Sequence, residues 1–252
     1  MALTKVIGDG IGSVGDDLSL VSDGSIVNFG VNSEISLTHV HNSGLTLASS
    51  VGATTFKIGR AGATDAKVIF DGNAQDYHIG LDDTNDSLVI GLGGTLGTTD
   101  SMVINAAGII TKPLQPAFQA KPASDQTNIA VGTEVNILFG TEIFDNNADY
   151  DGSFIFTAPV TGKYHLSGVV RLGAVDAASE YYIIRLRTSN RDRDFIFDSN
   201  EFSSDLDYVS FPFAITTDMD AGDQAYMRYY QNSGTAQTDV DSSSVFSGHL
   251  VC

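Results

Sequence analysis

The stretch YDGSFIFTAPVTGKYHLSG, residues 150–168, alternates apolar and polar side chains and decides the fold of the second half of the chain. Phe154 and Phe156 stand two positions apart, and the same spacing resumes at Tyr164 and Leu166. Successive side chains of a β-strand point to opposite faces, so this period of two predicts long strands with one buried face.

The alternation continues toward the C-terminus. Tyr182, Ile184 and Leu186 share one predicted face of the next strand, whereas Arg185 and Arg187 share the other. Polar segments such as FDNNADYDG and DMDAGD separate the apolar runs and predict turns. This half of the chain therefore fits an antiparallel two-sheet sandwich of the jelly-roll type.

The composition changes near residue 116. Residues 1–116 hold 17 of the 26 glycines but only 4 of the 23 Phe and Tyr residues, whereas residues 117–252 hold the other 19 aromatics. Such a shift marks a domain boundary. The stretch KPLQPAFQAKP contains three prolines and predicts a short, stiff linker over residues 113–122.

The first half predicts short β-strands separated by Gly, Asp and Asn, without helical periodicity. The predicted strands cover residues 25–30, 34–41, 45–48, 55–59, 66–71, 77–81, 88–92 and 102–105. The tripeptide Ile-Gly-Leu occurs at residues 79–81 and again 11 residues later. A weak repeat of this kind favours stacked hairpins or a β-solenoid over a compact sandwich.

This first half is too poor in large apolar side chains to fold as a single copy. Four aromatic residues bury too little surface to offset the entropy lost on ordering the chain. Association of identical copies supplies the missing burial, and closed cyclic symmetry is its usual form. We therefore predict an all-β homotrimer, with a fibre shaft over residues 16–112 wound about a threefold axis and a jelly-roll head over residues 117–252.

The central stretch FTAPVTGKYHLS resembles the sequence block of C1q-like domains, in which an F-T-A-P-V-x-G-x-Y-x-x-S core joins two long strands. Other segments resemble further parts of such domains in the expected order: residues 117–120 the opening strand, residues 219–223 a late turn and residues 246–251 the closing strand. The resemblance implies a trimeric jelly roll of the C1q and tumour-necrosis-factor type, which usually binds other molecules. No collagen-like repeat precedes it in this sequence.

The first half resembles fibre proteins of bacteriophages, particularly those of marine bacteria. The likeness rests on DDLSLVSDGSIVNFGVNSEISLTHVHNSGLTL, on VIFDGNAQDYHIGLDDTNDSLVIGLG and on the opening MALTKVIGDG. It implies a virion protein, assembled in the host cytoplasm, whose residues 1–15 dock to a virion attachment protein. The head would then bind a host-surface receptor, a glycan or a protein of the outer membrane, by avidity.

Two other functions remain open at this stage. In the first, the protein would be a purely structural virion component, such as a capsid decoration or tail connector, whose head contacts other virion proteins. In the second, it would be an enzyme such as a depolymerase. The sequence contains no nucleophile elbow, phosphate loop or spaced catalytic triad. We therefore predict no catalytic residue and no enzymatic activity.

The charge balance excludes several partners. The chain has 31 acidic and 13 basic side chains, a formal charge of −18, which opposes binding to nucleic acid. No stretch is long and apolar enough to insert in a membrane, and the opening residues lack the apolar run of a signal peptide. The single cysteine, Cys252, excludes an intrachain disulfide.

Two histidines form a candidate metal site. In the predicted strand over residues 34–41, His39 and His41 have the same parity as Ile35 and Leu37, so both imidazoles face inward. Three chains around an axis would present a ligand set suited to iron, nickel or zinc, and an H-x-H feature of some phage fibre proteins is similar. Alternatively, the strand ends or bulges at Thr38, and both histidines are ordinary hydrogen-bonded side chains on the rim.

A cationic cluster in the second half is the candidate receptor-binding site. Its residues are Tyr181, Arg185, Arg187, Arg191 and Arg193, with two aspartates interleaved among the last arginines. Aromatic rings beside charged groups suit the recognition of a sugar or an anionic glycan. The alternatives are a salt-bridged strand end and turn, or a trimer interface.

Two acidic turns are possible Ca²⁺ sites. Asn147, Asp149 and Asp151 imitate the first half of an EF-hand loop, but Ala158 stands where that loop requires Glu. The segment DDTND, residues 82–86, is similarly rich in oxygen ligands. Ordinary solvated turns are the simpler interpretation of both, and no other cofactor is implied.

Overall fold

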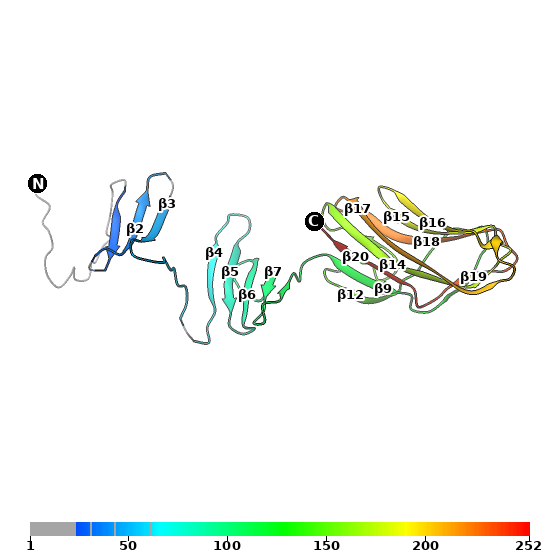
Figure 1. Ribbon diagram of the computed structural model, residues 1–252, viewed down its shortest axis with the longest axis horizontal. Coiled ribbons are helices and arrows are strands. Elements are labelled where there is room, and N and C mark those ends of the chain that lie inside the picture. Colours follow the sequence, from blue (N-terminus) through cyan, green and yellow to red (C-terminus); the bar gives the residue numbers. More distant parts are fainter. Residues whose placement is uncertain (1–23, 31, 43, 61) are drawn as a thin grey trace, which may run out of the picture. The chain divides into compact units, whose positions relative to one another are not determined.

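The computed structural model describes residues 24–252 except residues 31, 43 and 61 (Figure 1). The predicted docking segment, residues 1–15, lies outside the described residues. In the described part the regular elements are antiparallel β-strands and one short 3-10 helix, Ser199–Glu201. None of its helices is long and apolar enough to cross a membrane. The chain divides into two compact units, residues 1–61 and residues 62–252.

The first unit contains a three-stranded meander of β1 (Ile26–Phe29), β2 (Ile35–Val40) and β3 (Gly44–Ser49). The predicted strands at residues 25–30, 34–41 and 45–48 are confirmed to within two residues at each end. The predicted strand at residues 55–59 is wrong, because this segment is irregular and exposed. A five-residue run cannot hold an extended conformation without a neighbouring strand to complete its hydrogen bonds.

The second unit begins with a separate five-stranded sheet. It consists of β4 (Ala66–Phe70), β5 (Tyr77–Asp82), β6 (Ser87–Leu92), β7 (Asp100–Ile104) and β8 (Ile110–Thr111). Each strand pairs with the next along the chain, so the sheet is a meander of hairpins rather than a β-solenoid. Turn-forming residues lie between the strands. In the β5–β6 turn the Asp82 carboxylate accepts the Thr84 amide at 3.0 Å, and in the β7–β8 turn Gly108 adopts a φ of 79°.

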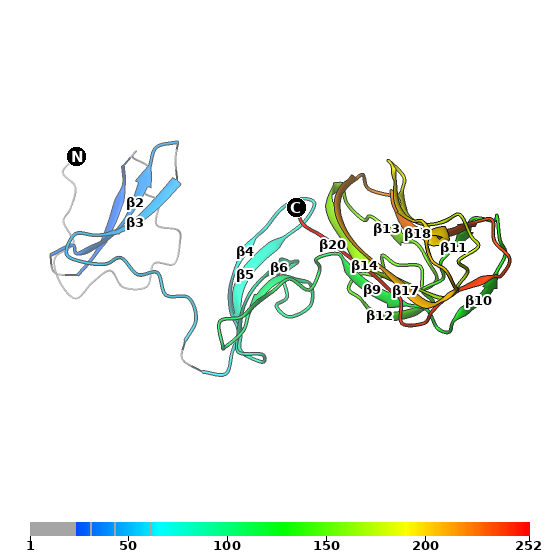
Figure 2. The same ribbon diagram turned by 45° about the vertical axis from the view of Figure 1, so that its right-hand side comes forward.

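The remainder of the second unit is a two-sheet sandwich. The strands are β9 (Ala117–Lys121), β10 (Gln126–Ile129), β11 (Val135–Asn136), β12 (Thr141–Asp145), β13 (Phe156–Thr157), β14 (Gly162–Val175), β15 (Tyr181–Thr188), β16 (Asp192–Phe197), β17 (Leu206–Met219), β18 (Gln224–Asn232), β19 (Thr238–Val240) and β20 (Val245–Leu250). One sheet has the order β10-β19-β14-β20-β9-β12 with β17 on β14, and the other has the order β11-β18-β15-β16 with β13 on β18. In Figure 2, β9, β12 and β14 of the first sheet face β11, β13 and β18 of the second. This arrangement confirms the predicted antiparallel jelly-roll sandwich.

A hydrophobic core fills the space between these two sheets. Tyr164, Tyr182 and Ile184 are fully buried, as their alternation predicted. Phe118 stacks on Phe156 with ring centroids 4.6 Å apart and meets Phe246 edge to face at 5.0 Å. The core cluster of the described residues contains side chains from residue 118 onward only. The aromatic enrichment of the second half therefore builds the core of the sandwich.

A buried polar network lies at one end of the sandwich. The carboxylate of Asp176, which is 1% exposed, accepts the amide hydrogens of Ala178, Thr235 and Ala236. Burial raises the pKa of this carboxyl, but the hydrogen bonds from Ala236, Ala178 and Thr235 outweigh burial, so that the net pKa is lowered. Asp176 therefore stays ionised and holds the segment before β19 against the end of β14.

Candidate binding face

The outer face of the sheet β11-β18-β15-β16 carries most of the candidate receptor-binding residues. Tyr181, Ile183, Arg185 and Arg187 of β15 point away from the core, because the alternate residues of this strand are buried. The neighbouring strands add further side chains to the same face, since Arg185 pairs in register with Arg228 of β18 on one side and with β16 on the other. We call this surface the binding face.

Arg185 lies at the centre of an ion-pair network on the binding face. Its Nε and Nη2 donate to the two carboxylate oxygens of Asp194 at 2.6 and 2.9 Å, and its Nη1 donates to Oε1 of Glu134 at 2.5 Å. The other oxygen of Glu134 pairs with Nη1 of Arg228 at 2.5 Å. The hydrogen bond from Arg185 lowers the pKa of the Asp194 carboxyl, and in turn Asp194 raises the pKa of Arg185. The network is balanced in charge and geometrically fixed.

A shallow hollow of about 290 Å³ adjoins this network. It is lined by Tyr181, Ile183, Arg185, Glu134 and Tyr230. The rings of Tyr181 and Tyr230 have centroids 6.3 Å apart. Two phenol rings beside a fixed set of charged hydrogen-bonding groups form an amphipathic surface that can take a sugar ring against an aromatic face and bond its hydroxyls.

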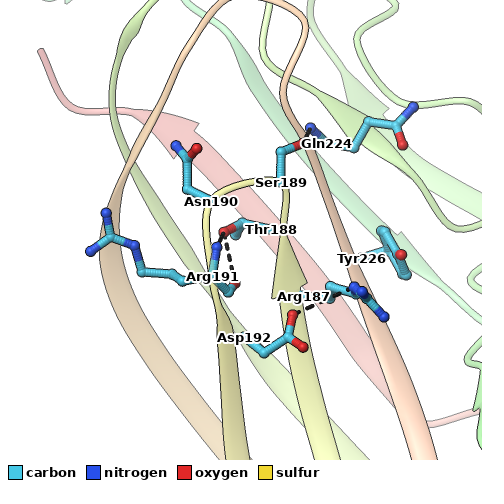
Figure 3. Close-up of a pocket in the computed structure, with 8 residues that line it drawn as sticks. All are labelled: Arg187, Thr188, Ser189, Asn190, Arg191, Asp192, Gln224 and Tyr226. Carbon is cyan, nitrogen blue, oxygen red and sulfur yellow. Dashed lines mark hydrogen bonds and ion pairs between the residues drawn. The ribbon is translucent and has the colours of Figure 1, made fainter.

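A second hollow, of about 380 Å³, lies where β15 turns into β16 (Figure 3). Its lining residues are Arg187, Thr188, Ser189, Asn190, Arg191, Asp192, Gln224 and Tyr226. Nε of Arg187 pairs with Asp192 at 3.5 Å beside Tyr226, while the Arg191 side chain points away from them and Nη2 pairs with Asp218 at 2.6 Å. The lining of this hollow is mostly polar, so the hollow suits a hydrated ligand better than an apolar one.

Comparison with known proteins identifies the sandwich. Residues 117–251 match the family described as the C1q domain. The chain belongs to the C1q domain family. C1q domains are non-enzymatic binding modules that commonly form homotrimers.

Solved structures include jelly rolls similar to this chain. The globular domain of zebrafish complement 1qA protein is 16% identical, with a TM-score of 0.41, and the match covers 55% of this chain and 98% of that one. Murine APRIL at pH 8.0 is 11% identical, with a TM-score of 0.39, over 54% of this chain and 99% of that one. No curated protein matches the chain in sequence.

The C1q domain does not gather all four predicted arginines on one face. Arg193 is opposite Leu186 in the β15–β16 register, so it projects from the other side of the sheet than Arg185 and Arg187. Arg191 lies in the turn. The alternative interpretation, a salt-bridged strand end and turn, describes Arg185, Arg187 and Arg191 in this structure. A receptor-binding role for the cluster stays a prediction.

Sequence reasoning missed the partners that complete the binding face of the C1q domain. Arg228 and Tyr230 lie two residues apart in the alternating stretch QAYMRYYQN, and their parity could have placed them beside the β15 arginines. Glu134 comes from the segment that precedes β11, and nothing in its neighbourhood indicates that it joins two arginines. The ion pairs of Glu134 with Arg185 and Arg228 could not be predicted, because they depend on the order of strands in the sheet, which periodicity alone does not give.

The two candidate metal-binding histidines differ in position. His39 lies in β2 opposite Leu45 and has the predicted parity with Ile35 and Leu37, but its side chain is exposed in the single chain. His41 lies beyond the end of β2, in the turn that leads to β3. Within the described part of a single chain, no group of three His, Cys, Asp or Glu side chains could hold a metal ion. A site shared by three chains stays a prediction.

In the two acidic turns considered for Ca²⁺, Asp151 and Asp82 accept hydrogen bonds from nearby amides. One carboxylate oxygen of Asp151 accepts the amides of the three residues at positions 153–155 at 2.8 to 3.0 Å. Asp82 accepts the Thr84 amide and the Asn85 side chain. These contacts account for both carboxylates as turn-forming groups, the simpler of the two interpretations.

Proposed function

We propose that this protein is a homotrimeric fibre component of a bacteriophage virion whose C1q domain binds a host-surface receptor through the binding face. One finding supports the homotrimer and its binding role: C1q domains are binding modules that commonly form homotrimers. The phage setting rests on the resemblance of the first half of the sequence to phage fibre proteins. The proposal gives residues 16–112 the role of a shaft and residues 1–15 that of the segment docked to the virion. The predicted linker over residues 113–122 is too long, because residues 117–121 form β9 of the sandwich, so the linker is reduced to residues 113–116.

The observation that carries the receptor proposal is the pairing of tyrosine rings with a fixed ion-pair network. Tyr181 and Tyr230 offer apolar ring faces, while Arg185 and Glu134 offer donors and acceptors in the same hollow. Because the arginines are paired with carboxylates, the surface has no large excess of positive charge. A neutral or weakly anionic glycan therefore fits better than a polyanion.

Three copies of such a hollow on one trimer explain how a weak site can serve attachment. A single shallow sugar site gives modest affinity, but linked sites convert later contacts into intramolecular ones and raise the overall avidity by about 10² to 10⁴. A small loss of binding free energy at each site should therefore cause a larger loss of affinity in the whole trimer, because three sites are affected together.

The test is the binding of the purified full-length trimer to host cells and to a panel of surface glycans. Tyr181→Ala should lower apparent affinity by about 10-fold or more, because the change acts on three sites at once. Tyr208→Ala is the matched control, since Tyr208 is a 59% exposed tyrosine on the other sheet. Retained binding in Tyr181→Ala with loss in Tyr208→Ala would move the receptor site to the other sheet.

The same preparation separates the receptor proposal from a purely structural role. A trimer that binds neither cells nor glycans but binds purified virion proteins would show that the head is a connector. Release of sugar from host polysaccharide would instead show an enzyme. Electron microscopy of virions labelled with an antibody to the C1q domain tests the location on the particle.

A further inference from the structure

The sheet β4–β8 has two chemically different faces. Its cross-strand partners include Tyr77 with Leu92, Ile79 with Ile90 and Leu88 with Ile104, so apolar residues meet apolar residues on the same side. We call this side the apolar face; its residues are Ala66, Val68, Phe70, Tyr77, Ile79, Leu81, Leu88, Ile90, Leu92, Met102, Ile104 and Ile110. The strand residues on this side include no charged side chain, because Lys67 and Asp82 are on the opposite side.

The opposite face of the sheet carries its charged and most of its polar strand residues together with Ile69, Val89 and Val103, and the chain itself covers part of it. His78, Asp82 and Ser87 on this face are 1%, 4% and 3% exposed. The loop over residues 93–99 lies across it, since Nδ1 of His78 is 2.8 Å from the Gly93 carbonyl oxygen and Nζ of Lys67 donates to the Gly94 carbonyl. The covering loop therefore protects the polar side of the sheet.

The apolar face, in contrast, is open in the single chain. Seven of its side chains are exposed by 36% to 61%, among them Phe70, Leu81 and Ile110. Together they expose on the order of 600 Å² of apolar surface, which is at the upper end of the largest patch on a typical monomer. Only Val89 and Leu96 among residues 62–112 are buried hydrophobic side chains, and Val89 belongs to the polar side. The more apolar side of the sheet is therefore the side left open to water, whereas the side with the buried His78 and Asp82 is the one the chain covers.

We propose that the apolar face is covered by the same face of two other copies of this chain, so that three β4–β8 sheets form one shared core around a threefold axis. The uncharged strand face supports this occupant, because identical faces meet there without like-charge repulsion. The exposed area has the scale of a specific interface, which buries about 800 Å² per partner. This inference deepens the homotrimer of the proposed function and rests on it, but it needs neither the virion nor the receptor.

The connection to the C1q domain also favours other copies as the occupant. Residues 112–116 join β8 to β9, and hydrogen bonds fix them to the sandwich: Nε2 of Gln115 donates to the Leu250 carbonyl at 3.0 Å, and the Leu250 amide donates to the Pro116 carbonyl at 3.0 Å. A C1q homotrimer would thus carry three copies of the sheet on short tethers. Short tethers give effective concentrations in the millimolar range, which favours association of the three faces.

Cross-linking of the full-length chain tests this inference. Ile90→Cys is placed at the centre of the apolar face and Lys67→Cys on the opposite face, each with Cys252→Ser to remove the native thiol. Mild oxidation should link two chains of each trimer through position 90 and leave position 67 unlinked. A trimer with no link at position 90, or linked equally at both positions, would overturn the inference.

A second measurement identifies other occupants. The wild-type trimer should bind little of a hydrophobic dye, whereas Ile79→Asp should bind several-fold more and be cut by protease within residues 62–112. Lys67→Asp is the control and should do neither. Strong dye binding by the wild-type trimer would show that the apolar face is uncovered. An apolar face that neither binds dye nor is cut by protease in a monomer would show that a single chain covers it. Either result overturns the inference. Receptor binding by the C1q trimer does not depend on the apolar face, so either result would overturn this inference and leave the proposed receptor function untouched.

Discussion

The C1q domain and the sheet β4–β8 share the same alternation of apolar and polar residues, but it gives a buried apolar face in the first and an exposed one in the second. In the C1q domain, Phe118 and Tyr164 of one sheet and Tyr182 of the other are buried between two layers of the same chain. In the sheet, Ile79 and Ile90 alternate just as regularly, but no second layer of the described chain covers them. Alternation thus makes a strand, whereas the supply of a second apolar layer decides whether one copy is enough.

The largest expected effect is a loss of stability on mutation of the core of the C1q domain, which a single chain buries by itself. Phe156→Ala removes a fully buried ring that stacks on Phe118, and it should lower the free energy of unfolding of the C1q domain by about 3–5 kcal/mol. Denaturant titration followed by tyrosine fluorescence measures the change. Val160→Ala, at a 46% exposed position, is the control and should change it by less than about 1 kcal/mol. A loss below about 1 kcal/mol for Phe156→Ala would contradict the self-contained core.

Glycines at close contacts allow the same comparison. A Cβ at Gly168 would lie 2.1 Å from the Val245 carbonyl oxygen, so Gly168→Ala should force β14 and β20 apart and destabilise the C1q domain by about 2–3 kcal/mol. Gly91→Ala would press on the Thr99 carbonyl oxygen at 2.6 Å and on Nε2 of His78 at 2.8 Å, so it should loosen the covering loop and the β4–β8 sheet but not the C1q domain. Limited proteolysis distinguishes the two sites. Loss of the C1q domain in Gly91→Ala would show that the two regions fold as one.

The buried carboxylate of Asp176 gives a pH dependence that belongs to the C1q domain. Its pKa is lowered in the folded state, so its contribution to stability is complete above the unfolded pKa of about 3.9 and is lost as the pH falls through the folded pKa. Asp176→Asn should cost about 1–2 kcal/mol at pH 7 and should flatten the fall in stability below pH 4. Denaturant titrations at pH 7 and pH 3 measure this. An unchanged acid limb would exclude Asp176 as its source.

The smallest expected effect concerns the binding face. Arg185→Ala breaks ion pairs that are partly exposed, so it should cost only about 0.5–1 kcal/mol of stability. Asp194 should then titrate nearer its ordinary pKa, because Arg185 lowers that pKa in the folded protein. Carboxyl titration by NMR measures the change, with Arg193→Ala as the control on the opposite face. Equal shifts in both variants would contradict the network.

Much of the fold followed from local pattern in the sequence. The burial of Tyr182, Ile184 and Leu186 required only their parity, and the stretch FTAPVTGKYHLS identified the C1q domain by its order of apolar residues, proline and glycine. Features that depend on distant segments did not follow. Nothing near Glu134 predicts that it bridges Arg185 and Arg228, because that contact needs the order of strands in the sheet.

The errors have the same physical origin. Residues 55–59 have the composition of a strand, but strand formation needs a neighbour, and none of the described strands pairs with them. The covering of the polar side of the β4–β8 sheet depends on one loop, residues 93–99, whose glycines indicated only turns. The sequence predicted a deficit of buried surface in the first half, and within the β4–β8 sheet the structure locates this deficit on one face.

Hydrogen exchange across a dilution series tests the central contrast most directly. The amides of Ile79 and Ile90 in the sheet are compared with those of Tyr164 and Leu166 in the C1q domain, in the full-length chain above and below the concentration at which the oligomer dissociates. We expect the sheet amides to lose their protection on dissociation while the C1q amides keep theirs. Equal protection of both sets in the monomer would contradict the account.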